Sequence, residues 1–322
     1  MFGWLGGFGV DGEKTDDHHK AWILSGRLTY RYPVSKTADG TQQIQFSSDL
    51  STWTTRGMSQ RVVSEDANRI VIEATAPSGT KGFFKVVGSG DTSMVWVQGG
   101  TLPQSSQLAG TAVATFQIGR TEVTWAEWQG VRDWAVANGY TDLAGIGSGS
   151  GPDHPVHSVN WYDVVKWSNA KSEKEGLTPV YQVSGAVYRT GQSNPTVTSG
   201  ANGYRLPTEA EWEWAARGGA NSQGYTYSGS NDVNAVAWYI QNSGYSAKAV
   251  ATKAANELGI HDMSGNVWEW CEDSDPNTGR RIRGGGADNE AGNCAVRARS
   301  DWNFPDHRSS QGGFRVARNA ED

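Results

Sequence analysis

The sequence lacks any concentration of basic residues and any long apolar run. Its 28 Lys and Arg residues are outnumbered by 34 Asp and Glu residues, which gives a formal net charge of −6. Proteins that bind nucleic acid need clustered positive charge to meet the phosphates, and a membrane-spanning helix needs about 18 or more consecutive apolar residues. We therefore expect no nucleic-acid partner and no membrane span.

The first ten residues do not have the pattern of a signal peptide. They are apolar and Gly-rich, but no basic segment precedes them and no convincing small-residue cleavage site follows them. We therefore expect no signal peptide within this chain, and its compartment is not readable from this segment.

Cysteine is scarce, and the common nucleophile motifs are missing. Cys271 and Cys294 are the only two cysteines, and a disulfide, two buried thiols or one reactive thiol are all compatible with that count. The chain has no G-x-S-x-G sequence, so the nucleophile elbow of the α/β-hydrolases is not predicted.

Glycine and tryptophan are abundant instead. The chain has 41 Gly and 15 Trp residues, although only 37% of its residues are hydrophobic. Many glycines indicate many tight turns and long loops, and tryptophan supplies large apolar bodies with a polar N–H. This composition favours a fold in which aromatic side chains anchor irregular chain.

The first ninety residues predict a β-rich module. Short β-prone runs alternate there with clusters of Gly, Asp, Ser and Thr, and no helical period is evident. The predicted strands cover residues 28–32, 43–46, 70–72 and 83–87. Residues 88–91 read as a linker, so we place one domain at residues 1–90 and a second at residues 91–322.

The second domain predicts three helices through their first residues. Thr124 with Glu127, and Thr208 with Glu211, have the spacing of a capping box, and Asn160 can cap a helix between them. The predicted ends are at residues 138–139, at residue 176 and at residues 218–219, where glycine occurs. Loop dominates the remainder, with short strands expected at residues 94–97, 116–118, 282–283 and 314–316.

Six segments of the second domain, in order along the chain, resemble the formylglycine-generating enzyme (sulfatase-modifying factor) family. The segments are residues 94–100, 119–124, 155–161, 204–215, 256–270 and 313–316. The resemblance implies an α+β, loop-rich, C-type-lectin-like fold of the formylglycine-generating-enzyme type, preceded here by the small β-rich module. Within this fold we expect Trp212, Trp214, Trp268 and Trp270 to pack in the core rather than to stack on a ligand.

The resemblance does not extend to the catalytic cysteines. In the oxidase members of the family, a Gly-Gly-Ser strand leads into a loop with two cysteines, whose thiolates bind copper(I). Here residues 284–286 are followed by residues 287–293 without a cysteine, and Cys294 comes next. We therefore expect a non-enzymatic member without copper. Non-enzymatic relatives also often carry cysteine at the positions of Cys271 and Cys294, and we hypothesise a neighbouring pair near the core, with a disulfide between them left open.

The segment 262–269 resembles the part of the family that wraps a structural calcium ion. Carried over residue by residue, the side chains of Asp262 and Glu269 and the backbone carbonyls of Gly265 and Val267 would be the ligands. Carboxylate and carbonyl oxygens are the ligands that calcium prefers. The alternative is that the motif only positions Trp268 and Trp270 in the core.

The C-terminal segment resembles the variable region of proteins that retroelements diversify. Glycines at its start, Pro305 near its middle and residues 313–315 at its end match that frame. Between them lie aromatic, Arg and small polar residues, a mixture typical of antibody-like binding surfaces. The predicted ligand-binding residues are Ala287, Glu290, Arg299, Asp301, Trp302, Asn303, Phe304, Asp306, His307, Arg308, Ser309 and Gln311.

We therefore predict a ligand-binding protein that displays a retroelement-diversified C-terminal surface on a C-type-lectin-like scaffold. The expected partner is a protein or another cell-surface ligand, which suggests a cell-surface or extracellular location. Two alternatives stay open: a copper-dependent oxidase relative with an altered active site, and a structural module of a surface assembly.

Overall fold

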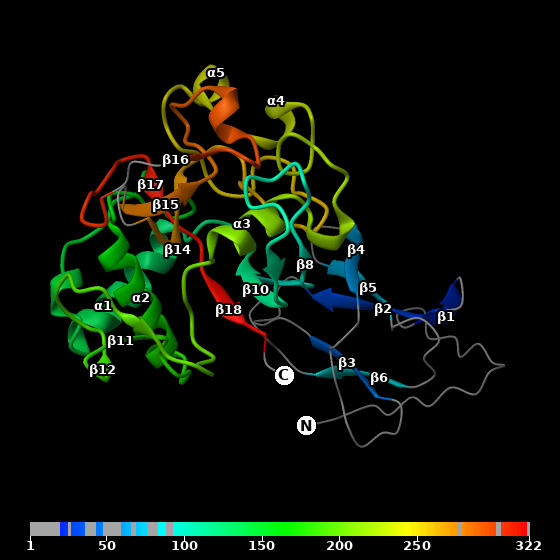
Figure 1. Cartoon of the computed structure of the whole chain (residues 1–322), viewed down its shortest axis with the longest axis horizontal. Helices are drawn as coiled ribbons and strands as arrows, with labels where there is room; N and C mark the ends of the chain where they lie inside the picture. Colours follow the sequence, from blue (N-terminus) through cyan, green and yellow to red (C-terminus); the bar gives the residue numbers. More distant parts are fainter. Residues whose placement is uncertain are drawn as a thin grey trace. The chain divides into compact units, whose positions relative to one another are not determined.

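The computed structural model describes residues 93–275, 279–300 and 304–320, together with the backbone of six earlier strands. Contacts divide the chain into two compact units, Met1–Gln98 and Gly99–Glu321. Figure 1 shows the elements of both units, which are described one at a time. The boundary at residue 90 stays a prediction.

The first unit consists of short antiparallel strands. Four of them form a sheet in the order β1-β2-β5-β4, and β3 pairs with β6. The runs predicted at residues 28–32, 43–46, 70–72 and 83–87 each lie within one of these strands, whereas β1 and β4 were not predicted. The strands are β1 Lys20–Leu24, β2 Arg27–Ser35, β3 Gln43–Ser47, β4 Ser59–Glu65, β5 Arg69–Thr75, β6 Phe83–Val87 and β7 Met94–Val97.

The second unit combines helices, short strands and much loop. Its largest sheet has the order β16-β15-β14-β17. Its helices are α1 Trp125–Ala137, α2 Trp161–Lys174, α3 Glu209–Ala216, α4 Val233–Val236 and α5 Ile240–Ser243, with 3-10 turns at Thr141–Leu143, Gly219–Asn221 and Ala291–Cys294. Its strands are β8 Gly100–Thr101, β9 Ala112–Val113, β10 Phe116–Gly119, β11 Tyr181–Val183, β12 Ala186–Val187, β13 Thr196–Val197, β14 Trp268–Asp275, β15 Gly279–Arg283, β16 Arg299–Ser300, β17 Gly312–Gly313 and β18 Ala317–Asn319.

The three long helices begin where the sequence predicts. The Thr124 side chain accepts a hydrogen bond from the backbone of Glu127 and caps α1. Reciprocal capping boxes start the other two, with Asn160 at the start of α2 and Thr208 at the start of α3. These bonds satisfy N–H groups that have no partner inside the helix, so the predicted helix starts are confirmed.

The strand predicted at residues 314–316 is wrong. Strands β17 and β18 flank this segment, and its backbone bonds instead to the chain around β10. The Phe314 carbonyl accepts from Val123 N–H (2.9 Å), and the Val316 carbonyl accepts from Gly119 N–H (2.7 Å). The residue types of this segment suggest a strand, but the side chains of successive residues, such as Phe314 and Arg315, are all buried rather than alternating between two faces.

The core joins α1, α2 and the C-terminal chain. The rings of Trp128 and Trp167 stack with centroids 5.5 Å apart, and Phe314 meets the Trp167 ring edge-on at 5.3 Å. Figure 1 shows α1 and α2 next to each other in the second unit. Among the tryptophans predicted for the core, Trp212, Trp214 and Trp270 are buried, and Trp268 is half-buried.

Candidate functional site

The C-terminal loop at residues 304–310 is fixed to the chain that starts α2. The Trp161 N–H donates to the Pro305 carbonyl over 3.0 Å, and the Ser158 N–H donates to the Ser309 carbonyl over 2.9 Å. Bonds at both ends of the loop hold its backbone in one place, so its side chains are presented from a defined frame.

Arg308 also anchors this loop. Its guanidinium donates two hydrogen bonds to the Asp163 carboxylate, from Nε over 2.7 Å and from Nη2 over 2.9 Å. Asp163 is buried and belongs to the capping box of α2. The hydrogen bond to Asp163 raises the pKa of Arg308. A paired, bidentate guanidinium is held in place, so this predicted ligand contact has a scaffold role.

Three other predicted residues of the loop face solvent. The Phe304 side chain is 69% exposed, and Asp306 and His307 are also exposed. A large apolar side chain in this position gains no stability from burial. Burial therefore does not account for a large apolar side chain at this position.

The two predicted ligand-binding residues of the glycine-rich loop at residues 284–294 differ in their exposure. Ala287 is fully buried, and its carbonyl accepts a hydrogen bond from Ser243 Oγ of α5 over 2.5 Å. Glu290, three residues later, is exposed. Position 287 therefore supplies no exposed side-chain surface, whereas position 290 does.

Ser309 and Gln311 are partly exposed. Ser309 Oγ accepts from the Gln311 N–H over 3.1 Å. Gln311 Oε1 is buried without a hydrogen-bond partner, and a Cβ on Gly286 would lie 3.3 Å from it. Gln311 therefore joins the loop at residues 304–310 to the glycine-rich loop. The remaining predicted residues, Asp301, Trp302 and Asn303, lie outside the described residues.

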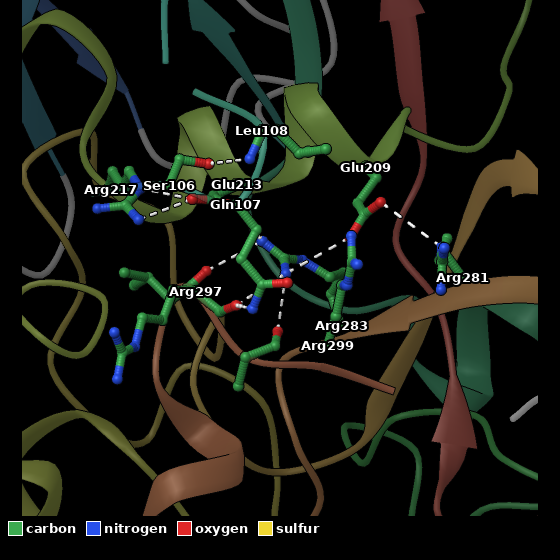
Figure 2. Close-up of polar contacts among 12 residues, drawn as sticks. Ser106, Gln107, Leu108, Glu209, Glu213, Arg217, Arg281, Arg283, Arg297 and Arg299 are labelled. Carbon is green, nitrogen blue, oxygen red and sulfur yellow. Dashed lines mark hydrogen bonds and ion pairs between the residues drawn. The ribbon is translucent and has the colours of Figure 1, made fainter. Parts of the chain in front are cut away.

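Arg299 belongs to an ion network over α3, which Figure 2 shows. Its guanidinium lies 3.8 Å from the Glu209 carboxylate, which Arg281 approaches to 3.8 Å and Arg283 to 3.6 Å. Burial raises the pKa of Glu209, and the positive charge of Arg283 partly offsets this rise. Arg299 is only partly exposed. Its ion pair with Glu209 connects β16 to α3.

We define the recognition surface by its exposed described members, Glu290, Phe304, Asp306, His307 and Arg308. The exposed large apolar side chains of the described residues are Phe304, Val197 and Tyr245. Tyr245 lies close to the glycine-rich loop through Ser243, since Ser243 Oγ accepts from the Tyr245 N–H over 3.0 Å. No sequence motif pointed to Tyr245.

Cys271 and Cys294 are both buried and both free thiols. The disulfide that the sequence left open is not formed in the structure. Cys271 lies on β14, whereas Cys294 packs with Ala237 and Tyr239. Burial raises the pKa of both thiols, that of Cys294 to about 12. Protonated, buried thiols are poor nucleophiles and poor metal ligands.

The predicted calcium ligands lie in a buried acidic cluster. Burial and the charges of Asp262 and Glu269 raise the pKa of Glu122, and burial raises that of Asp262. The charge of Arg315 lowers the pKa of both carboxyl groups, and His261 also lowers that of Asp262. Three carboxyl groups thus face one guanidinium, and Asp262 Oδ1 has no hydrogen-bond partner.

The negative charge of this cluster is compatible with a bound cation, because buried carboxylates need positive charge nearby to offset the cost of their burial. Glu269 already accepts hydrogen bonds from Arg315 and from Trp212 Nε1. Among the described residues no three His, Cys, Asp or Glu side chains converge to hold a metal. A calcium ion would therefore depend on two carboxylates and the carbonyls of Gly265 and Val267, oxygen ligands that suit it.

The fold and this surface define a C-type-lectin-like domain of the formylglycine-generating-enzyme type without the copper-binding cysteine pair. The sequence model of the sulfatase-modifying factor enzyme 1-like domain matches residues 85–320. The chain belongs to this family. In the part of the chain that the structure describes, no helix is long and apolar enough to cross a membrane.

Individual relatives differ in the roles that their names give. The chain is 38% identical to chaperone protein LppX of Paenibacillus barcinonensis over 236 residues, which cover 62% of this chain and 81% of LppX. The crystal structure of CarF has a TM-score of 0.63 and 31% identity, covering 71% of this chain and 98% of CarF. Treponema denticola variable protein 1 has a TM-score of 0.59 and 30% identity, covering 75% of this chain and 97% of that protein.

Proposed function

We propose that this chain is a non-enzymatic binding protein whose ligand is another protein, contacted through the recognition surface. The observation that carries the proposal is the exposed Phe304 on a loop whose backbone and Arg308 are fastened to α2. A rigid frame lowers the entropy lost on binding, and an exposed aromatic ring supplies contact area. The likeness to Treponema denticola variable protein 1 supports a binding role, and LppX is named a chaperone, a kind of protein that acts on proteins.

The missing cysteine pair supports the same proposal. Residues 287–293 contain no cysteine, and both thiols of the chain are buried. Soft metal ions such as copper(I) need accessible thiolates. We therefore propose no copper chemistry, and a cell-surface or extracellular site of action.

We also propose that the C-terminal segment is diversified by a retroelement. Support comes from the arrangement of the recognition surface, in which the backbone of residues 305–309 is bonded to the start of α2 while Phe304, Asp306 and His307 are exposed. An adenine-rich near-copy of the 3′ coding segment beside a reverse-transcriptase gene would be the genomic evidence. Genomic sequence without such a copy would overturn diversification and leave the binding role intact.

Phe304→Ala is expected to weaken binding about tenfold or more, because truncating an aromatic anchor removes much of the affinity of an interface. The probe is a set of peptides selected from a phage-displayed library of random twelve-residue peptides on the immobilised chain. Their affinities are measured by calorimetry. Val197→Ala is the matched control, since Val197 is 53% exposed on β13. Equal affinities for the Phe304→Ala and unmodified chains would contradict the proposed surface.

A structural calcium ion is a separate proposal, and it has its own test. Without metal, the raised pKa values of Glu122 and Asp262 mean that the folded state holds protons more tightly than the unfolded state. Their contribution to stability is therefore present below the ordinary carboxyl pKa and is lost as the pH rises through the raised values. In chelator, we expect a lower melting temperature at pH 8 than at pH 6.

Added calcium should reverse this loss, and more so at pH 8. At 100 times the dissociation constant it would add about 2.7 kcal/mol, or roughly 5–10 °C in a domain of this size. Asp262→Asn should abolish the calcium response, and Asp133→Asn, at a side chain 71% exposed, should keep it. Identical melting curves in calcium and in chelator would refute the proposal.

A further inference from the structure

The chain that starts α2 holds the loop at residues 304–309 mainly through the backbone of the loop. Besides the two hydrogen bonds from the Ser158 and Trp161 N–H groups, Asn160 Nδ2 donates to the Asp306 carbonyl over 3.2 Å. All three acceptors are backbone carbonyls, which every residue type has. These three bonds can therefore form whatever side chains the loop carries.

Arg308 is the exception, because its bonds to α2 run through its side chain. Among the described hydrogen bonds, Arg308 is the only residue of the loop whose side chain is bonded to α2. The Asp163 side chain that accepts these bonds is 2% exposed, whereas the Arg308 side chain is 39% exposed. The scaffold therefore sets a requirement on the residue type at position 308 that it does not set at the exposed positions 304, 306 and 307.

The Asp163 carboxylate serves the helix and the loop at the same time. Its Oδ2 atom accepts from the Asn160 N–H over 2.9 Å, which completes the capping box of α2, and from Arg308 Nε over 2.7 Å. Its Oδ1 atom accepts from Arg308 Nη2 over 2.9 Å. Lys166, which lies one turn further along α2, is bonded to Asp142 over 2.7 Å. Within the described residues, Arg308 is thus the basic group that pairs with Asp163.

Another residue at position 308 would leave this buried carboxylate without its basic partner. Removing one side of a buried ion pair is strongly destabilising, because the remaining charge stays desolvated. A lysine ammonium is a single point and cannot reproduce both bonds of the guanidinium. Water could reach the carboxylate only if the loop moved away from α2. A loop without Arg308 is therefore expected to spend more time detached from the helix.

Building on the proposed function, we infer that Asp163 is a positioning residue of the recognition surface and that it restricts position 308 to arginine. Asp163 acts through Arg308, which holds the loop so that Phe304 and His307 meet the ligand in one arrangement. The contribution of Arg308 to binding is to fix the loop rather than to contact the ligand. If the C-terminal segment is diversified, arginine stays at position 308 while positions 306 and 307 change.

Asp163→Asn separates the two tasks of the carboxylate. An amide oxygen can still accept from the Asn160 N–H and cap the helix, but a neutral amide cannot bind the guanidinium of Arg308 as a charged, two-oxygen acceptor. The probe is again the set of peptides selected on the unmodified chain. We expect their affinity for the variant to fall about tenfold, because binding must then order the loop.

Hydrogen exchange, followed by NMR without any ligand, reports the position of the loop directly. The Ser158 and Trp161 amides are bonded to carbonyls of the loop, so in Asp163→Asn they should exchange at least about tenfold faster. The Val164 amide is bonded to the Asn160 carbonyl within α2, and its exchange should stay the same. Arg308→Gln should give the same pattern, so this measurement remains decisive if Asp163→Asn does not fold.

Glu211→Gln is the matched control. Glu211 completes the capping box of α3 and accepts two hydrogen bonds from Arg205, each over 2.7 Å, so it has the same two tasks as Asp163. The other described side-chain bonds of Arg205 go to Leu206 and Asn319, outside the loop at residues 304–309. The substitution should lower the melting temperature but leave unchanged both the peptide affinity and the exchange of the two amides that bond to the loop.

A double variant distinguishes positioning from ligand contact. If Arg308 acts through Asp163, then Arg308→Gln and Asp163→Asn should each weaken binding by about the same factor, and together by no more than either alone. Losses that multiply, or unchanged exchange in both single variants, would overturn the inference. Peptides sensitive to Phe304→Ala but indifferent to Asp163→Asn would also overturn it alone, whereas peptides indifferent to Phe304→Ala would overturn the proposed function with it.

Discussion

Arg315→Met is expected to lower the free energy of unfolding by about 3–5 kcal/mol at pH 7.5, as does breaking other buried ion pairs from one side. Arg315 is fully buried, and its Nε and Nη2 atoms each lie 2.6 Å from an oxygen of Glu269. It also lowers the pKa of Glu122 and of Asp262. Methionine would leave three buried carboxyl groups without their basic partner.

Urea unfolding followed by tryptophan fluorescence measures this loss. Arg132→Met is the control, because Arg132 pairs with Asp133, whose side chain is 71% exposed, and such pairs contribute less than about 1 kcal/mol. The loss at Arg315 should shrink as the pH is lowered from 7.5 towards the ordinary carboxyl range, because carboxyl groups with raised pKa values take up protons on the way. Equal losses in the free energy of unfolding at Arg315 and Arg132 would show that the charge of Arg315 does not stabilise the buried carboxyl groups.

A second variant keeps the test decisive if Arg315→Met does not fold. In Arg315→Met/Glu269→Gln the closest carboxylate also loses its charge, so part of the stability should return. A double variant no more stable than the single one would place the effect of Arg315 in packing rather than in charge. The calcium measurement on the unmodified chain is independent of either variant.

The beginnings of the helices could be read from the sequence because each depends on residues three positions apart. Thr208 and Glu211 bond to each other's backbone in the structure, as their spacing predicts. Such bonds can be predicted without knowing which distant parts of the chain lie nearby. The prediction of a strand at residues 314–316 was wrong for the opposite reason. The backbone partners of this segment, such as Gly119, lie far away in the sequence.

The sequence named the C-terminal segment as a binding surface, which stays a prediction, but it could not show which of its side chains meet buried partners. Arg308 and His307 are neighbours with similar chemistry, yet only Arg308 meets a buried carboxylate, that of Asp163. That carboxylate lies 145 positions away in the chain. Ala287 is buried because Ser243 of α5 covers its carbonyl. Both outcomes depend on tertiary contacts that residue types do not encode.

Tyr245 was missed because its two unusual properties are conformational. A tyrosine after a glycine has no motif, and neither its positive φ nor its exposure is visible in the residue order. The family resemblance gave the frame of the second domain. It could not give the backbone conformation of a loop outside the C-terminal segment.

Arg283→Lys is expected to cost about 2–4 kcal/mol of stability, although it keeps the charge. Arg283 is fully buried on β15, and its Nη2 donates to Glu213 over 2.5 Å. Its Nη1 donates to the Ala298 carbonyl over 2.9 Å. A lysine ammonium is a single point and cannot reproduce this planar fork, so one buried acceptor would lose its partner.

The same substitution should weaken binding, because Arg283 joins α3 to the chain that leads into the recognition surface. Ala298 precedes β16, and Arg299 of β16 lies next to Glu209 in the same network (Figure 2). Arg189→Lys is the control, because the Arg189 side chain is 39% exposed where it pairs with Glu173, and such a pair should contribute at most about 1 kcal/mol. Stability comes from chemical unfolding, and binding from the selected peptides below the melting temperature of the variant. A loss of stability with unchanged affinity would show that the α3 network supports the fold without setting the position of the surface, whereas a loss of both would make Arg283 the link between them.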